Sequence, residues 1–191
     1  MAYPMSRRAD RFVSGLVLAG AHRLGSPLHL RPLRRVVATA RACRFDQLLI
    51  AVGGAAAAVA GVDFAGADVI LEGDEPSSFA AALHRMDPRT DVLVLLLGDQ
   101  PRVTPATVQT LVDGMGPATL AACGYASGRG HPLAFGRDAF GELSTVDEDA
   151  GIWQLLDRHR DSVVDVPITG RPPRDDDVWS AYGVPAPILD A

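Results

Sequence analysis

The sequence predicts an α/β protein built on a mostly parallel sheet with helices on both faces. Short apolar segments alternate with segments of helical periodicity from residue 15 to residue 115, which is the pattern of consecutive β-α units. The strand-like segments are continuous apolar runs rather than alternating ones, as expected where helices cover both faces of a sheet. A chain of 191 residues is long enough for one such domain, which we place at 13–191 after a loose arm at 1–12.

Four strands and four helices are expected in the regular first part of the chain. The strands are short apolar runs that end at glycine or, in the last case, at aspartate: 15–20, 45–54, 67–73 and 91–99. The helices are expected at 32–43, 55–60, 77–86 and 104–115. Thr104 is the expected N-cap of the last helix, with Pro105 at its first position, and Ser77 or Ser78 is the expected N-cap of the third. Less regular segments follow at 119–126, 130–135 and 163–168, with a helix near 147–159.

The composition excludes several classes of protein. The net charge of −5 argues against binding to nucleic acid by phosphate neutralisation, although a metal ion and a few arginines suffice to bind a nucleotide. All eighteen basic residues are arginine, so no mechanism can use a lysine. Cys43 and Cys123 fit neither a disulfide framework nor a zinc site. No apolar run is long enough to predict a membrane span, and no leader segment is evident at the N-terminus, so we expect a cytoplasmic protein.

The residues that follow the fourth apolar run are the strongest candidates for chemistry. Ligands of open parallel sheets bind beyond the carboxyl ends of the strands, and this run ends in Gly98, Asp99 and Gln100. Gly98 allows the backbone to approach a ligand, and Asp99 places a carboxylate where Mg²⁺ can bind. The alternative is that Asp99 only caps the loop before Thr104.

Several segments, taken together, resemble the molybdenum cofactor cytidylyltransferases and the related molybdopterin-guanine dinucleotide synthases. The clearest is LLLGDQPRVTP at 95–105. Four others occur in the order expected for this family: SSFAAAL at 77–83, GRGHPLAF at 128–135, DEDAGIW at 147–153 and RDDDVWSAY at 174–182. The resemblance covers roughly residues 15–182 and implies a three-layer α/β/α, Rossmann-like nucleotidyltransferase fold.

The resemblance also implies a reaction. A nucleotidyl group, CMP from CTP, would pass to the terminal phosphate of molybdopterin as pyrophosphate leaves, which is chemistry that depends on positioning and charge neutralisation. Mg²⁺ would be the cofactor. The ligands would be a nucleoside triphosphate, CTP or GTP, and a molybdopterin-type cofactor, with a molybdoenzyme apoprotein as a further partner and neither nucleic acid nor membrane as one.

The family resemblance assigns roles to particular residues. Asp99 and Arg23 would be catalytic, and Asp99 and Asp177 would hold Mg²⁺, although residues 174–177 also fit a solvated acidic turn. The acceptor would contact Gln100, His131 and Asp149. The nucleotide would contact Leu18, Ala19, Gly20, Gly25, Ser78 and Gly98.

The first loop departs from the family pattern. The segment LAGAHRLGSPLHL at 18–30 is about two residues shorter, and Leu28 occupies the position of the family's lysine. Arg23 and Gly25 remain, and Arg31 is a partial substitute, although a planar guanidinium is not a point ammonium. Glu148 replaces a family glycine, where it would either repel an anionic pterin phosphate or face solvent at a helix start.

Three functions therefore stay open on the sequence. The first is the cytidylyltransferase. The second is a noncatalytic relative that acts as a maturation partner of a molybdoenzyme, which the missing lysine favours. The third is guanylyl transfer by the same fold. His131 either donates to a phosphate or pterin or is a structural residue, whereas Trp153 and Trp179 are expected to pack rather than to stack on a ligand.

Overall fold

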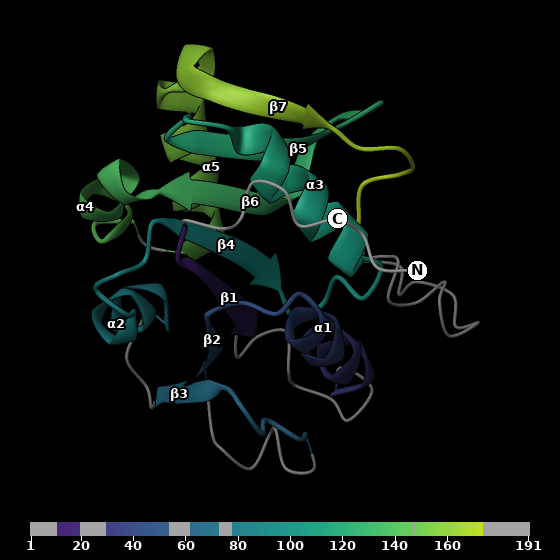
Figure 1. Cartoon of the computed structure of the whole chain (residues 1–191), viewed down its shortest axis with the longest axis vertical. Helices are drawn as coiled ribbons and strands as arrows, with labels where there is room; N and C mark the ends of the chain where they lie inside the picture. The colour runs from purple at the N-terminus through teal and green to yellow at the C-terminus, as the bar shows by residue number, and fades with distance from the viewer. Residues whose placement is uncertain (1–10, 20–29, 54–61, 73–77, 147, 174–191) are drawn as a thin grey trace, which may run out of the picture.

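The computed structural model describes residues 11–19, 30–53, 62–72, 78–146 and 148–173. A seven-stranded sheet of order β3-β2-β1-β4-β6-β5-β7 runs through the molecule (Figure 1). Its strands are β1 (Val13–Ala19), β2 (Gln47–Gly53), β3 (Asp68–Glu72), β4 (Val92–Leu97), β5 (Leu120–Tyr125), β6 (Gly128–Gly136) and β7 (Val163–Pro167).

The sheet is mostly parallel, as predicted. Strand β1 pairs in parallel with both β2 and β4, β2 pairs in parallel with β3, and β5 pairs in parallel with β7. Strand β6 runs against its two neighbours, β4 and β5. The carboxyl ends of β1 to β4 therefore lie at one edge of the sheet, and β6 begins at that same edge.

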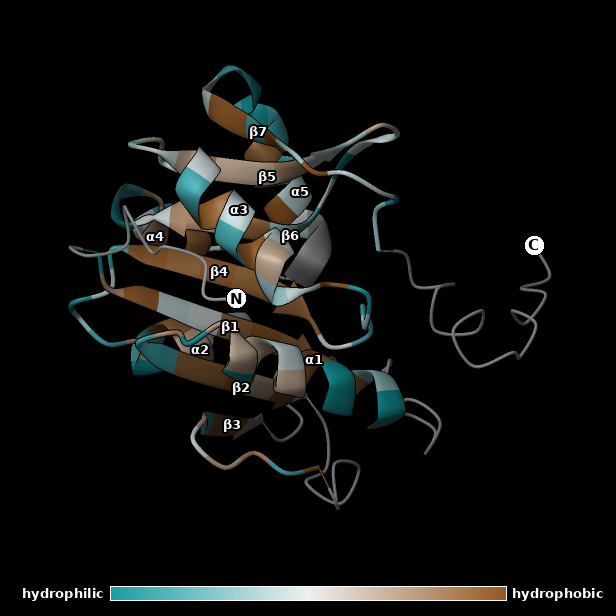
Figure 2. Cartoon of the chain, turned by 45° about the vertical axis from the view of Figure 1, so that its right-hand side comes forward, coloured by the Kyte–Doolittle hydropathy of each residue, from teal (hydrophilic) through white to brown (hydrophobic). Residues whose placement is uncertain are grey.

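Helices cover both faces of the sheet. Helices α1 (Leu30–Ala42) and α3 (Pro105–Met115) contribute to the apolar cluster on one face, and they lie in front of the sheet in Figure 2. Helices α2 (Ser78–Arg85), α4 (Phe140–Leu143) and α5 (Glu148–Arg158) contribute to the cluster on the other face. Short 3-10 turns at Arg137–Ala139 and Arg160–Ser162 connect the later elements. The result is the three-layer architecture that the sequence predicts.

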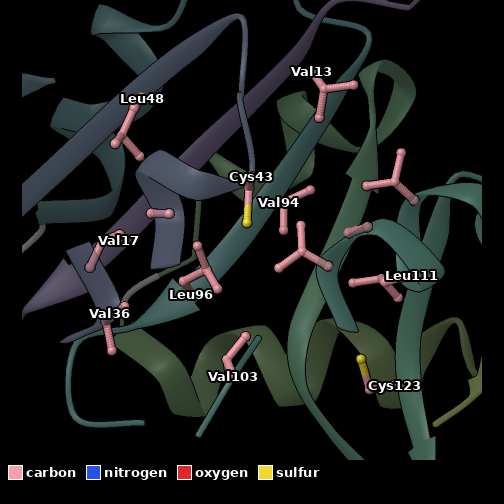
Figure 3. Close-up of a cluster of buried hydrophobic side chains, with 14 of the residues drawn as sticks. Val13, Val17, Val36, Cys43, Leu48, Val94, Leu96, Val103, Leu111 and Cys123 are labelled. Carbon is pink, nitrogen blue, oxygen red and sulfur yellow. The ribbon is translucent and has the colours of Figure 1, made fainter. Parts of the chain in front are cut away.

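Strand β4 shows why its sequence is a continuous apolar run. All six of its residues are buried, because their side chains alternate between the two apolar clusters. Val94 and Leu96 belong to the α1 and α3 side, drawn in Figure 3, whereas Leu93 and Leu95 belong to the opposite side. A strand at the centre of a covered sheet has no polar face.

The predicted elements are confirmed, with shifts of a few residues at their ends. The helix expected at 55–60 and the N-terminal residues 1–10 lie outside the described residues. The irregular segments at 119–126 and 130–135 form the hairpin of β5 and β6, and 163–168 forms β7. Thr104 caps α3 as expected, since its Oγ1 accepts a 3.1 Å hydrogen bond from the amide of Thr107. In the described part of the chain, no helix combines the length and the apolar character needed to cross a bilayer.

Candidate active site at the carboxyl edge of the sheet

Gly98 forms a hydrogen bond between the end of β4 and the end of β1. Its amide donates a 2.8 Å hydrogen bond to the carbonyl of Leu18. A Cβ at this position would lie 3.1 Å from that same oxygen, 3.1 Å from Leu33 Cδ1 and 3.3 Å from Ala19 Cβ. The glycine is therefore needed for close packing against β1 and α1, which is a structural reason that the sequence analysis did not give. Leu18, Ala19 and Gly98 therefore lie together at this edge.

Asp99 follows directly, half-buried at the carboxyl end of the central strand. The turn that carries it is fixed by backbone hydrogen bonds from Gln100 to Leu97 at 3.1 Å and from Val103 to Gln100 at 3.3 Å. Thr39 of α1 adds a bond from its hydroxyl to the carbonyl of Val103 at 3.3 Å. Helix α3 has its own N-cap in Thr104, so its start does not depend on the Asp99 carboxylate.

Gln100 turns away from solvent. The residue is only 5% exposed, and its Oε1 is buried with no hydrogen-bond donor in the described part of the chain. Its backbone amide and carbonyl both take part in the turn. A buried amide oxygen in this state is an exception to the usual pairing of buried polar groups.

His131 lies near the start of β6, on the other side of β4 from β1. It is 4% exposed, and its ring meets the ring of Trp153 edge to face, with centroids 5.3 Å apart and planes at 86°. The carbonyl oxygen of His131 accepts a 2.8 Å hydrogen bond from the hydroxyl of Tyr125. The pairing of β5 with β6 shifts register here: Ala122 pairs with Leu133, but the next residue, Cys123, pairs with Gly130.

The environment of Tyr125 keeps its hydroxyl protonated. Burial raises the pKa of Tyr125 above its usual range, and the neighbouring Cys123 raises it further. Burial also raises the pKa of the Cys123 thiol to about 12. Neither group ionises near neutral pH, so Tyr125 is a hydrogen-bond donor and Cys123 is not a nucleophile.

The segment that follows β7 also lies at this edge. A Cβ on Gly130 would lie 3.0 Å from the ring of Tyr125 and 3.3 Å from Cβ of Pro172. Pro172 therefore packs beside the start of β6, near the carboxyl end of β4. The described chain ends at residue 173, four positions before Asp177.

Other predicted site residues have a known backbone position only or lie outside the described residues. Ser78 is the first residue of α2, which follows β3, and Asp149 is in the first turn of α5. Both helices begin at the carboxyl edge. Helix α2 follows β3, which ends at this edge. Helix α5 precedes β7, which begins at the opposite edge. The following lie outside the described residues: Gly20, Arg23, Gly25, Leu28, Asp177 and Trp179.

The chemistry of this edge suits an anionic ligand held through a hard metal ion. Asp99 supplies a carboxylate oxygen of the kind that Mg²⁺ and Mn²⁺ prefer. Residues 11–19, 30–53, 62–72, 78–146 and 148–173 hold no group of three or more His, Cys, Asp or Glu side chains that could form a complete metal site by themselves. An ion bound by Asp99 would therefore need further ligands from outside this set.

The sequence analysis did not identify Tyr125 as a residue of the site, and it gave Trp153 a packing role only. Trp153 does pack against the apolar cluster, but its ring also contacts His131, a predicted substrate-binding residue. The partner of the Tyr125 hydroxyl depends on a register shift between β5 and β6. No local sequence signal gives that shift.

Comparisons with known proteins identify the family and the fold. Residues 15–163 match the family model of the MobA-like NTP transferase domain. No curated protein matches the chain. The structure of Rv0371c from Mycobacterium tuberculosis H37Rv in complex with manganese is 37% identical, with a TM-score of 0.80 over 90% of this chain and 96% of that one.

Two further structures define how far the likeness extends. A homologue of that protein from Mycobacterium sp. strain JC1 is 39% identical, with a TM-score of 0.80 over 90% of this chain and 93% of that one. A nucleotidyl transferase from Methanothermobacter thermautotrophicus is 17% identical, with a TM-score of 0.66 over 88% of this chain and 90% of that one. At that identity the second likeness is one of fold.

Proposed function

Because the chain belongs to the MobA-like NTP transferase family, we propose that it transfers CMP from CTP to the terminal phosphate of a molybdopterin-type cofactor. The observation that carries the proposal is the position of Asp99, a half-buried carboxylate on a hydrogen-bonded turn at the carboxyl end of the central strand. Ligands of open parallel sheets bind at this edge.

The nucleotide half of the proposed site is built on β1 and β4. Leu18, Ala19 and Gly98 are packed together, and residues 20–29 connect β1 to α1. The triphosphate would lie against that segment and the N-terminus of α1, where backbone amides and the helix dipole favour an anion. Arg23 is the proposed catalytic cation of the loop, with Gly20 and Gly25 supplying close backbone approach.

A divalent ion, which we propose to be Mg²⁺, would be held by Asp99 and by Asp177. When bound, the ion would neutralise part of the charge of the triphosphate. The complex of Rv0371c with manganese supports a divalent ion at this fold, and Pro172 beside Gly130 brings the chain to the same edge shortly before Asp177. The protein's own contribution is to fix the Asp99 carboxylate by the turn between Leu97 and Val103.

The acceptor half would lie on the β6 side of β4. His131, held by Tyr125 and Trp153, and Asp149 in the first turn of α5 are the proposed contacts, together with Gln100. In the transfer step an oxygen of the acceptor phosphate bonds to the α-phosphorus, the bond to the β-phosphate oxygen breaks, and pyrophosphate carries away the electron pair. The residues of both halves act by orienting these two phosphates.

Calorimetry with CTP, GTP and ATP, each with and without Mg²⁺, tests the proposal. We expect CTP to bind in the presence of Mg²⁺ at least tenfold more tightly than GTP or ATP, and to bind more weakly without it. Release of pyrophosphate that depends on the molybdopterin-type acceptor completes the test.

Two results would replace the proposal with one of its rivals. Preference for GTP would indicate guanylyl transfer. Failure of every nucleotide to bind with Mg²⁺ present would indicate a noncatalytic relative that acts as a maturation partner, as the shortened loop and the absent lysine favour.

A further inference from the structure

We infer that Gln100 is a specificity residue whose amide oxygen accepts a hydrogen bond from an exocyclic amino group on the acceptor's ring. The inference rests on the proposed function, because it names which part of a pterin-type acceptor the protein recognises. It starts from a feature that the fold does not explain, namely a buried amide with no partner for its oxygen.

The buried side-chain amide of Gln100 lowers the stability of the folded protein. Gln100 is 5% exposed, and no donor in the described ranges reaches its Oε1. A buried acceptor that has lost its water without gaining a donor reduces stability. The turn does not require the side chain either, since the backbone of Gln100 makes the two hydrogen bonds that shape it. An apolar side chain of the same length would serve the fold better.

Gln100 lies between the nucleotide half and the acceptor half of the edge, and we assign it to the acceptor half. Gly98, two residues earlier, packs on Leu18 and Ala19 of β1, the nucleotide half. From there the chain crosses into α3, which packs against β5, β6 and β7. Gln100 lies on this crossing, which Thr39 of α1 also contacts through the carbonyl of Val103, and the affinity of the Gln100→Met variant for CTP distinguishes the two halves.

An amide suits the recognition of one edge of a heteroaromatic ring. The Oε1 atom accepts from an amino group, and Nε2 donates to an adjacent ring nitrogen, in the same way that glutamine pairs with the edge of adenine. A pterin presents a 2-amino group next to N1. Binding requires the amide to turn toward the edge when the ring arrives, which is a side-chain rearrangement of the kind common at interfaces.

Thermal unfolding of the Gln100→Met variant tests the first half of the inference. Methionine has a similar length and no group to leave unpaired, so we expect Tm to rise by about 2–4 °C. The matched control is Gln154→Met on the exposed surface of α5, for which no change is expected. A lower Tm for Gln100→Met would mean that the amide has a structural partner and would overturn the inference.

Fluorescence titration with two probes tests the second half. Pterin carries the 2-amino group, and lumazine carries an oxygen in its place. In the presence of CTP and Mg²⁺, we expect the parent protein to bind pterin about tenfold more tightly than lumazine, as one well-placed hydrogen bond allows. Gln100→Met should bind the two alike, through loss of affinity for pterin alone.

The two failures are distinguishable. If the parent prefers pterin and Gln100→Met keeps that preference, this inference is wrong while the proposed function stands. If Gln100→Met instead loses affinity for CTP, the residue belongs to the nucleotide half and the inference is again wrong. If the parent binds no CTP with Mg²⁺ present, the proposed function itself fails.

Discussion

The hydroxyl of Tyr125 donates a 2.8 Å hydrogen bond to the carbonyl oxygen of His131. This contact crosses the register shift between β5 and β6, where regular pairing cannot satisfy the backbone. Because burial raises the pKa of Tyr125, the hydroxyl stays protonated and the bond persists over the physiological pH range. Tyr125 and Trp153 together hold His131 in one position beside the carboxyl end of β4.

Replacing Tyr125 by phenylalanine should therefore destabilise the protein and impair the acceptor side. The variant leaves the buried carbonyl of His131 without its donor, which we expect to cost about 1–3 kcal/mol of unfolding free energy in urea titration. We also expect a higher KM for the acceptor and an unchanged affinity for CTP. Ser144→Ala, which removes an exposed hydrogen bond of 2.7 Å, is the control. A loss of CTP affinity equal to the loss for the acceptor would argue against this positioning role.

Asp99→Asn should weaken nucleotide binding only when the metal is present. The substitution keeps the shape of the side chain and removes its charge, so the protein should stay folded with a similar Tm. We expect at least a tenfold loss in CTP affinity with Mg²⁺, because the carboxylate is a direct ligand in the proposed site. Calorimetry with and without Mg²⁺ measures this. Asp161→Asn, at an exposed position, is the control, and equal affinity of Asp99→Asn and the parent would reject the metal role.

The sequence allowed a correct prediction of the regular β-α part of the fold. Buried strands such as β4 leave a continuous apolar run, and the N-cap at Thr104 has a local signature that needs no tertiary information. The same run located Asp99 at the end of a central strand. These features depend on residues that are adjacent in the chain, so a single sequence contains them.

Features that depend on pairing between distant segments were not predictable. The hairpin of β5 and β6 shifts register beside His131, and the bond from Tyr125 follows from that shift. Gln100 was expected to contact substrate, but its burial was not foreseen, because burial depends on what packs over the turn. The close packing of Gly98 against Leu18, Ala19 and Leu33 likewise joins segments that are distant in the chain.

Acid should weaken the attachment of the first strand at Asp91. The Phe12 amide donates a 2.9 Å hydrogen bond to Asp91 Oδ2, which lowers the pKa of Asp91, and Arg137 lowers it further. A carboxyl with a lowered pKa in the folded state stabilises the protein above its ordinary pKa, and this contribution is lost as the pH falls through the folded value.

The variant Asp91→Asn removes that titration. We expect it to be less stable than the parent at pH 7, and we expect the difference in unfolding free energy to shrink as the pH falls from about 4, the ordinary pKa of aspartate, toward the lowered pKa of Asp91 in the folded parent. Urea titration of both proteins at several pH values measures this. A difference that stays constant down to pH 2.5 would contradict the assignment.

The departure in the first loop leads to the final prediction, that Leu28→Lys strengthens binding of CTP. The triphosphate carries about four negative charges at neutral pH, and a divalent ion offsets only two. An ammonium about 4 Å from a phosphate oxygen contributes on the order of 4 kcal/mol of Coulomb energy at an effective dielectric of 20. Desolvation and ordering of the side chain offset much of this. We expect a net gain of about 1 kcal/mol, or several-fold in affinity, by calorimetry with Mg²⁺.

Two variants separate the effect of charge at this position from other effects. Leu28→Met changes the side chain without adding charge and should bind CTP as the parent does. Leu24→Lys adds the same charge elsewhere in the loop and should gain less, because Coulomb attraction falls with distance and is screened by salt. Loss of stability in Leu28→Lys without a gain in affinity would show that residue 28 is not the lysine position. Arg23 or Arg31 would then be the cation for the triphosphate, and the missing lysine would no longer count against catalysis.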